Sequence, residues 1–140
     1  MWSEIEEVAD RSSDLKYAIV NALMAESNLF RTRLDNIEKA IEYLEKGMLL
    51  YKGLEEKDEV NNKNIIDVFH HIGVYLSDNH NSELAETYFN RGLEFIEQLD
   101  SKKQNEVDVE KYLLYSDLSI LYFSKNYNIE KAISLQQGGY

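Results

Sequence analysis

An amphipathic helix recurs three times in this sequence, and this repetition limits the possible folds more than any other feature. The copies are NIEKAIEYLEKGMLLY from Asn36, SELAETYFNRGLEFIE from Ser82 and NIEKAISL from Asn128. With Ala40, Ala85 and Ala132 in register, the spacings are 45 and 47 residues. A helix that recurs at such a period is typical of solenoids, in which each antiparallel helix pair buries its apolar face against its neighbours.

The rest of the chain agrees with an all-α fold of about three antiparallel helix pairs. There is no proline and there are only six glycines in 140 residues, whereas strand-rich folds use both residues as breaks. Three- and four-residue apolar steps predict helices near 14–33, 36–55, 63–78, 82–99, 107–124 and 129–137. Ser12 or Ser13, Asp35 and Ser82 are the expected N-caps. We assign residues 1–13 to an extension or short helix, 14–137 to the repeat domain and 138–140 to a tail.

Composition excludes several classes of function. Without cysteine the chain has no disulfide, no thiolate nucleophile and no zinc site of the cysteine type. A net charge of -11 repels nucleic-acid phosphates, so this segment is not expected to bind nucleic acid. The acidic start MWSEIEEVADR does not resemble a signal peptide. No apolar run approaches the roughly 20 residues that span a bilayer, which predicts a cytoplasmic protein without membrane contact.

The middle helix pair resembles the tetratricopeptide repeat. Seven residues stand at that repeat's spacing for large, large, small, large, small, aromatic and small side chains: Phe69, Ile72, Gly73, Leu76, Ala85, Phe89 and Gly92. The small residues are expected where two helices approach closely. The third pair matches at Tyr115, Leu118, Ser119 and Tyr122, and the first at Leu23, Ser27 and Phe30, each with a one-residue insertion. The first match places Glu26 where an apolar residue is expected.

Residues 90–133 are similar to the PlcR-like regulators, and the chain resembles the peptide-sensing domains of PlcR/Rgg-type receptors of Gram-positive bacteria. The likeness rests on the repeat length, an acidic linker and the YxxxSxLYF style of the helix from Tyr115. It implies a right-handed superhelical solenoid that senses a short peptide for quorum-sensing transcription regulation, as a homodimer. Such receptors carry an N-terminal helix-turn-helix domain, and none precedes Asp14, which implies a sensor fragment or a stand-alone relative. A further interpretation is a Rap-like regulator, which binds a response-regulator protein instead of DNA.

A solenoid exposes a concave surface built from the first helix of each pair, so ligand candidates lie one step from the packed stripe. They are Asn21, Met24, Asn28 and Arg31, then Asp67, His70, Val74 and Ser77, then Leu113, Ser116, Ile120 and Phe123. An asparagine amide can donate to and accept from a peptide backbone at once. We expect Asn21, Asn28 and Asp67 to hold the backbone or charged ends of a peptide. The alternative is that the two asparagines are solvated helix residues.

Catalytic, metal and cofactor motifs are not expected. His70 and His71 point about 100° apart on a helix, which does not favour a shared metal ion. The carboxylates of Glu55, Glu56, Asp58 and Glu59 fit a solvated linker better than a calcium loop. We find no nucleophile elbow, no phosphate loop and no placed histidine partner for a serine, so the prediction is a binding protein and not an enzyme.

The alternative function is a scaffold for homo- or hetero-oligomer assembly. The last predicted helix is short and no polar capping helix follows it, although repeat arrays need caps. The side expected to be uncovered comprises Tyr122, Ile129, Ala132, Ile133 and Leu135. We expect another copy of the chain, or residues of a longer parent, to cover it.

Overall fold

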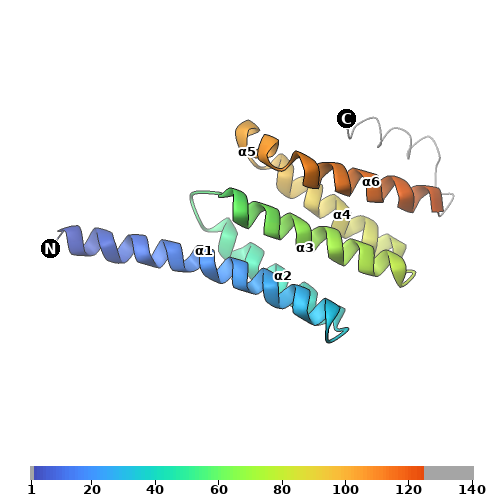
Figure 1. Cartoon of the computed structure of the whole chain (residues 1–140), viewed down its shortest axis with the longest axis horizontal. Coiled ribbons are helices and arrows are strands. Elements are labelled where there is room, and N and C mark those ends of the chain that lie inside the picture. Colours follow the sequence, from blue (N-terminus) through green and yellow to red (C-terminus); the bar gives the residue numbers. More distant parts are fainter. Residues whose placement is uncertain (1, 125–140) are drawn as a thin grey trace. The chain divides into compact units, whose positions relative to one another are not determined.

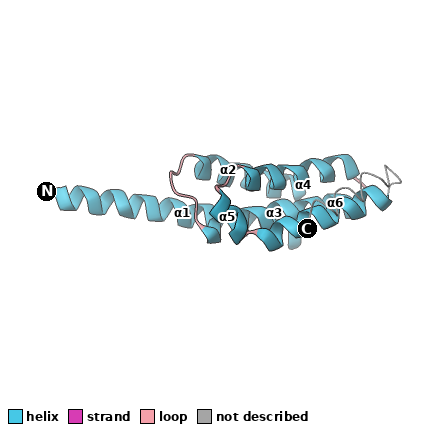
Figure 2. Cartoon of the chain, turned by 90° about the horizontal axis from the view of Figure 1, so that it is seen from above, coloured by secondary structure: helices cyan, strands magenta, loops and turns pink. Residues whose placement is uncertain are grey.

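The computed structural model describes residues 2–124, with side chains from Asp14 onward. Six helices occupy this range: α1 (Trp2–Thr32), α2 (Ile37–Lys52), α3 (Glu59–Asp78), α4 (Ser82–Glu97), α5 (Ser101–Glu106) and α6 (Asp108–Ser124) (Figure 1). Helices and loops account for the whole described range, which contains no strand (Figure 2). The all-α prediction is confirmed for these residues. The helix predicted over 129–137 and the tail lie outside the described residues.

The predicted start of the first helix is wrong, and one helix was not predicted. α1 begins at Trp2 and continues through Ser12 and Ser13, so neither serine caps it. No glycine or proline interrupts the helix there, so nothing ends the hydrogen-bond ladder. α5 lies between the predicted helices 82–99 and 107–124, where no helix was expected. Asp100 starts it, because its side chain accepts a hydrogen bond from the Lys103 N–H at 2.9 Å.

The N-caps of α2 and α4 are each displaced by one residue from the prediction. Asn36, not Asp35, accepts from the Lys39 N–H at 3.1 Å, and Asn81, not Ser82, accepts from the Leu84 N–H at 3.4 Å. The residue before each asparagine has a positive φ, 47° at Asp35 and 63° at His80. The chain therefore reverses at Asp35 and His80, and the following asparagine becomes the cap.

Removing the Asn36 side-chain acceptor is expected to weaken α2. Asn36→Ala should lower the free energy of unfolding by about 1 kcal/mol, because one N–H of the first helical turn loses its partner. Asn36→Ser retains an acceptor and should retain most of the stability. Urea denaturation of the three proteins measures the difference. An alanine variant as stable as the wild type would show that the cap contributes nothing.

The described residues divide into two compact units, a first that ends at Asn64 and a second that begins at Ile65, so the boundary lies inside α3. In the first unit α1 packs against α2. The two helices are antiparallel, because Phe30 stacks on Tyr43 with ring centroids 5.2 Å apart while Tyr17 meets the Tyr51 ring edge-on at 6.3 Å. Ser27, at a predicted small position, is buried, and its hydroxyl donates to the Ala40 carbonyl at 2.6 Å.

A buried polar cluster closes the end of α2 in the first unit. The Tyr51 hydroxyl donates to Asn62 Oδ1 at 2.6 Å and accepts from the Asp58 N–H at 2.9 Å. Lys57 Nζ donates to the Tyr51 carbonyl at 2.7 Å, which satisfies one of the last acceptors of α2. Tyr51 and Asn62 are 1% and 0% exposed, so these bonds form away from water. Glu55, Glu56 and Glu59 are exposed, as expected of a solvated linker, while Lys57 and the Asp58 backbone are held by these hydrogen bonds.

The second unit is built on close helix contacts at two glycines. A Cβ atom on Gly73 would lie 2.4 Å from Cε1 of Phe89, and one on Gly92 would lie 3.0 Å from Cδ1 of Leu114 and 3.2 Å from Cβ of Phe69. α3 and α4 thus approach at Gly73, and α4 packs against α6 at Gly92. Both glycines were predicted at close approaches, and both are confirmed there. All seven repeat-signature residues are buried.

The prediction of an uncovered side at Tyr122 is wrong. Its side chain is 3% exposed, and its hydroxyl contacts a carboxylate oxygen of Glu86 on α4. This position belongs to the contact between α4 and α6, because the helix repeat turns Tyr122 toward α4. The other residues expected on that side, Ile129, Ala132, Ile133 and Leu135, lie outside the described residues.

Candidate functional site

The predicted ligand residues fall in both units and are described unit by unit. Asn21, Met24, Asn28 and Arg31 lie on α1 in the first unit. Asp67, His70, Val74 and Ser77 lie on α3, and Leu113, Ser116, Ile120 and Phe123 lie on α6, all in the second unit.

Met24 belongs to the core and not to an open surface. Its side chain is 2% exposed, and a Cβ on Gly47 would lie only 2.3 Å from its Cε. Glycine on α2 leaves the space that the methionine fills. Val20, Met24 and Ser27 form the buried stripe of α1. These residues are four and three positions apart, so they share one face of the helix, which is the core face. The predicted ligand stripe on α1 included Met24 and therefore lay partly on that core face.

Asn21 is engaged within the first unit. Its Oδ1 accepts hydrogen bonds from Nδ2 of Asn61 and from Nδ2 of Asn64, both at 2.9 Å. Asn61 also donates to the Tyr17 carbonyl at 3.0 Å. These bonds tie α1 to the first turns of α3. The sequence analysis did not predict this role, because asparagines such as Asn61, Asn62 and Asn64 are mostly exposed in proteins and their spacing does not indicate burial.

Asn28 and Arg31 share the last turns of α1. Arg31 Nη2 lies 3.4 Å from Asn28 Oδ1, and both side chains are half-buried. Arg31 Nε is buried and has no hydrogen-bond partner among the described residues. Burial lowers the pKa of the Arg31 guanidinium from its ordinary value. A buried donor without an acceptor is costly, so Arg31 Nε is an unsatisfied polar group at this end of α1.

In the second unit, His70 and Asp117 bring α3 and α6 together. Nε2 of His70 contacts Oδ2 of Asp117, a carboxylate 47 residues away along the chain. The two side chains are 17% and 27% exposed, so the pair lies at the edge of the surface. On the neighbouring residue, Nδ1 of His71 lies 2.7 Å from the Asp67 carbonyl. The sequence placed His70 on this surface but gave no reason to select Asp117.

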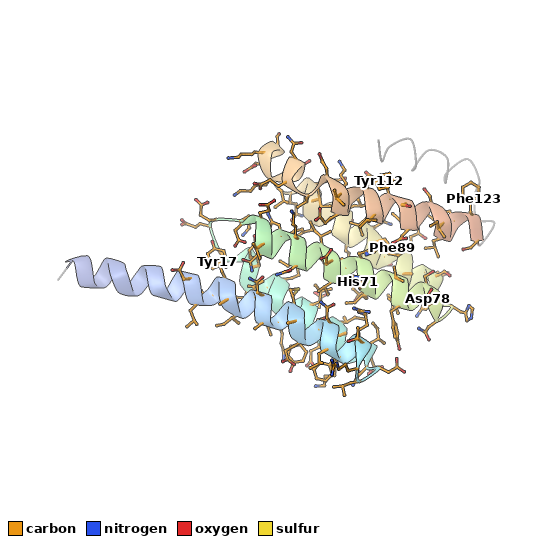
Figure 3. The ribbon with its side chains drawn as sticks, viewed as in Figure 1. Tyr17, His71, Asp78, Phe89, Tyr112 and Phe123 are labelled. Atoms are coloured by element: carbon orange, nitrogen blue, oxygen red, sulfur yellow. The ribbon has the colours of Figure 1, made fainter. Side chains whose placement is uncertain are left out.

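An apolar stripe is exposed on α6. Ile120 is 60% exposed, Phe123 43% and Leu113 41%. Val109 and Tyr112 are also exposed and extend the same face, because the steps of three and four residues keep these side chains together. Tyr112 and Phe123 are labelled on α6 in Figure 3. We call these five residues the α6 stripe; Ser116 lies within it and is half-buried.

Acidic groups surround the α6 stripe. Asp108, Glu110 and Asp117 lie on α6, and Asp67 lies on the adjoining helix α3. Lys111 precedes Leu113 by two residues and therefore lies about 160° away around the helix. Oε2 of Glu110 is buried without a hydrogen-bond partner among the described residues. The stripe is thus apolar with a negative border, which attracts cationic groups.

The described side chains contain no group of three or more His, Cys, Asp or Glu residues that could hold a metal ion. An open pocket of about 610 Å³ lies beside Tyr17 in the first unit, with Leu54, Glu55, Glu56 and Asp58 in its lining.

Comparison of the chain with protein-family models, with curated proteins and with solved structures finds no match in any of the three. None of the helices between residues 2 and 124 is long and apolar enough to cross a membrane.

Proposed function

We propose that this chain is a non-enzymatic peptide-binding module with a TPR-like architecture, a right-handed solenoid of about three antiparallel helix pairs. We further propose that it serves as the sensor part of a cytoplasmic, peptide-responsive bacterial regulator of the PlcR/Rgg type. The observation that supports this is the α6 stripe beside the His70–Asp117 pair: exposed apolar side chains next to polar groups on an adjoining helix. This combination is typical of surfaces that bind peptide segments.

The chemistry of the surface indicates the ligand. From Val109 to Phe123 the stripe is about 21 Å long at 1.5 Å per residue. About six residues of extended peptide span that length. Apolar side chains of the peptide would lie on Leu113 and Ile120, and a lysine, arginine or amino terminus would lie near the acidic border. The matching ligand is therefore a short apolar peptide with a positive charge.

Ligand-dependent stabilisation tests this proposal. The probe is a synthetic pool of six- and seven-residue apolar peptides that each carry one lysine. A peptide present at a hundred times its Kd should raise the Tm by roughly 5–10 °C, because it binds only the folded chain. Ile120→Asp places a carboxylate in the stripe and should abolish the rise. Leu84→Asp is the matched control, because Leu84 is an exposed leucine on α4 and is not part of the α6 stripe.

The peptide proposal fails if no member of the pool gives a saturable shift with the wild-type chain. It fails equally if Ile120→Asp responds as the wild type does, since the binding would then lie elsewhere.

A further inference from the structure

The outward side of α1 is apolar where a surface helix normally carries charge. We define the α1 face as Leu15, Ala18, Ile19, Ala22, Ala25 and Leu29, all exposed, with Leu15 61% exposed, Ile19 41% and Leu29 40%. At 100° per residue these positions share an arc of about 120°. A helix that buries one side usually shows polar residues on the other. The segment 15–29 contains two charged residues, Lys16 and Glu26, and of these only Glu26 falls within the arc.

The pattern of the α1 face is symmetric about Ala22 except at Ala18, whose counterpart four residues after Ala22 is Glu26. Leu15 and Leu29 stand seven residues before and after it, and Ile19 and Ala25 stand three residues away on either side. If two such helices pair antiparallel around Ala22, each Leu15 lies level with a Leu29 of the partner subunit. The small Ala22 side chains meet at the centre and let the helices approach closely. A two-fold dimer requires this kind of self-complementary patch.

Charge selects the antiparallel arrangement. Lys16 lies outside the arc and Glu26 inside it, on the same side of the midline of the α1 face, and antiparallel pairing brings the same sides of the two helices together. Lys16 of the partner subunit is then level with Glu26 to within about 3 Å along the axis. Parallel pairing would instead place the two Glu26 carboxylates side by side. Each chain carries a net charge of -11, so two copies repel except at a charge-poor or complementary face.

We propose that the α1 face binds a second copy of this chain, in an antiparallel α1 pair with Ala22 at the two-fold axis. The interface lies in the first unit and does not involve the α6 stripe. The dimer proposal can therefore be tested independently of the peptide-binding proposal.

Sedimentation of the full chain tests the dimer. The wild type should show a concentration-dependent monomer–dimer equilibrium. Leu15→Glu should raise its Kd at least about tenfold, because a carboxylate replaces an apolar contact. Leu49→Glu is the matched control: Leu49 is 77% exposed on α2, and the substitution adds the same charge outside the face. A wild type that stays monomeric at several hundred micromolar, or equal effects of the two variants, would overturn the proposal.

Single cysteines test the arrangement, since the chain has none of its own. Under mild oxidation Ala22→Cys should form a disulfide-linked dimer and Leu49→Cys should not, because only the central position brings two copies within bonding distance. A mixture of Leu15→Cys and Leu29→Cys should cross-link faster than either variant alone. Faster linkage of Leu15→Cys by itself would overturn the antiparallel pairing. Helix content by circular dichroism confirms that each variant is folded.

Discussion

Phe89→Ala should lower the free energy of unfolding by about 3–5 kcal/mol, the largest loss expected for a single substitution in the second unit. The ring is 1% exposed and fills the space beside Gly73, so truncation removes buried apolar area and leaves a cavity. The same change at Phe123, which is 43% exposed on α6, should cost far less. Urea denaturation followed by circular dichroism measures both. Similar losses at the two positions would contradict the packing described for Phe89.

The sign of the effect of Gly73→Ala should depend on Phe89. In the wild type a methyl group at Gly73 would lie 2.4–2.8 Å from three atoms of the ring. Such overpacking costs about 1–3 kcal/mol, which outweighs the gain of about 1 kcal/mol from alanine in a helix. In the Phe89→Ala background the ring is gone, so Gly73→Ala should be stabilising. The four unfolding free energies form a double-mutant cycle, and additive effects would show that residues 73 and 89 do not touch.

Tyr51→Phe should destabilise the chain by about 1–3 kcal/mol although it removes a single oxygen atom. The hydroxyl satisfies both Asn62 Oδ1 and the Asp58 N–H, and Asn62 is fully buried. Nδ2 of Asn62 already has no hydrogen-bond partner among the described residues, so a second unpaired atom there is especially costly. Tyr43→Phe is the control, because its ring contact with Phe30 persists. Chemical denaturation should separate the two variants.

The same hydroxyl gives an alkaline signature. Burial raises the pKa of Tyr51 above its ordinary value of 10.0. Above about pH 10 the unfolded chain releases this proton while the folded chain retains it, so stability falls as pH rises. The contribution is complete below pH 10. Tyr51→Phe should therefore lose stability less steeply than the wild type between pH 10 and 11.5. Parallel pH profiles would mean that Tyr51 titrates alike in both states.

The helices could be predicted from the sequence because three- and four-residue apolar spacing is a local property. The ends of the helices were harder to predict. Asp35 and Ser82 had suitable cap side chains, but the positive φ of Asp35 and His80 moved the caps to Asn36 and Asn81. The backbone conformation at Asp35 and His80 cannot be deduced from the pattern of side chains. The start of α5 could have been predicted from the sequence, since Asp100 is a favourable N-cap residue.

The candidate site was predictable to the extent that it depends on helix periodicity. Ile120 is on the exposed face of α6 that its spacing indicated. Met24 was misplaced because its burial depends on Gly47, a residue of another helix. Likewise, the pairing of His70 with Asp117 joins residues 47 positions apart. Contacts of this kind arise from how helices pack, which a single sequence does not reveal.

The position of the unit boundary inside α3 bears on cooperativity. A helix is stabilised by each hydrogen bond that follows its costly first turn, so the two parts of α3 support each other's backbone. If residues 59–64 unfold, the rest of α3 gains a new amino-terminal end at Ile65. If the part of α3 from Ile65 onward unfolds, residues 59–64 gain a new carboxy-terminal end at Asn64. Continuity of one ladder therefore couples the melting of the two compact units, and the coupling weakens if the helix is interrupted near Asn64.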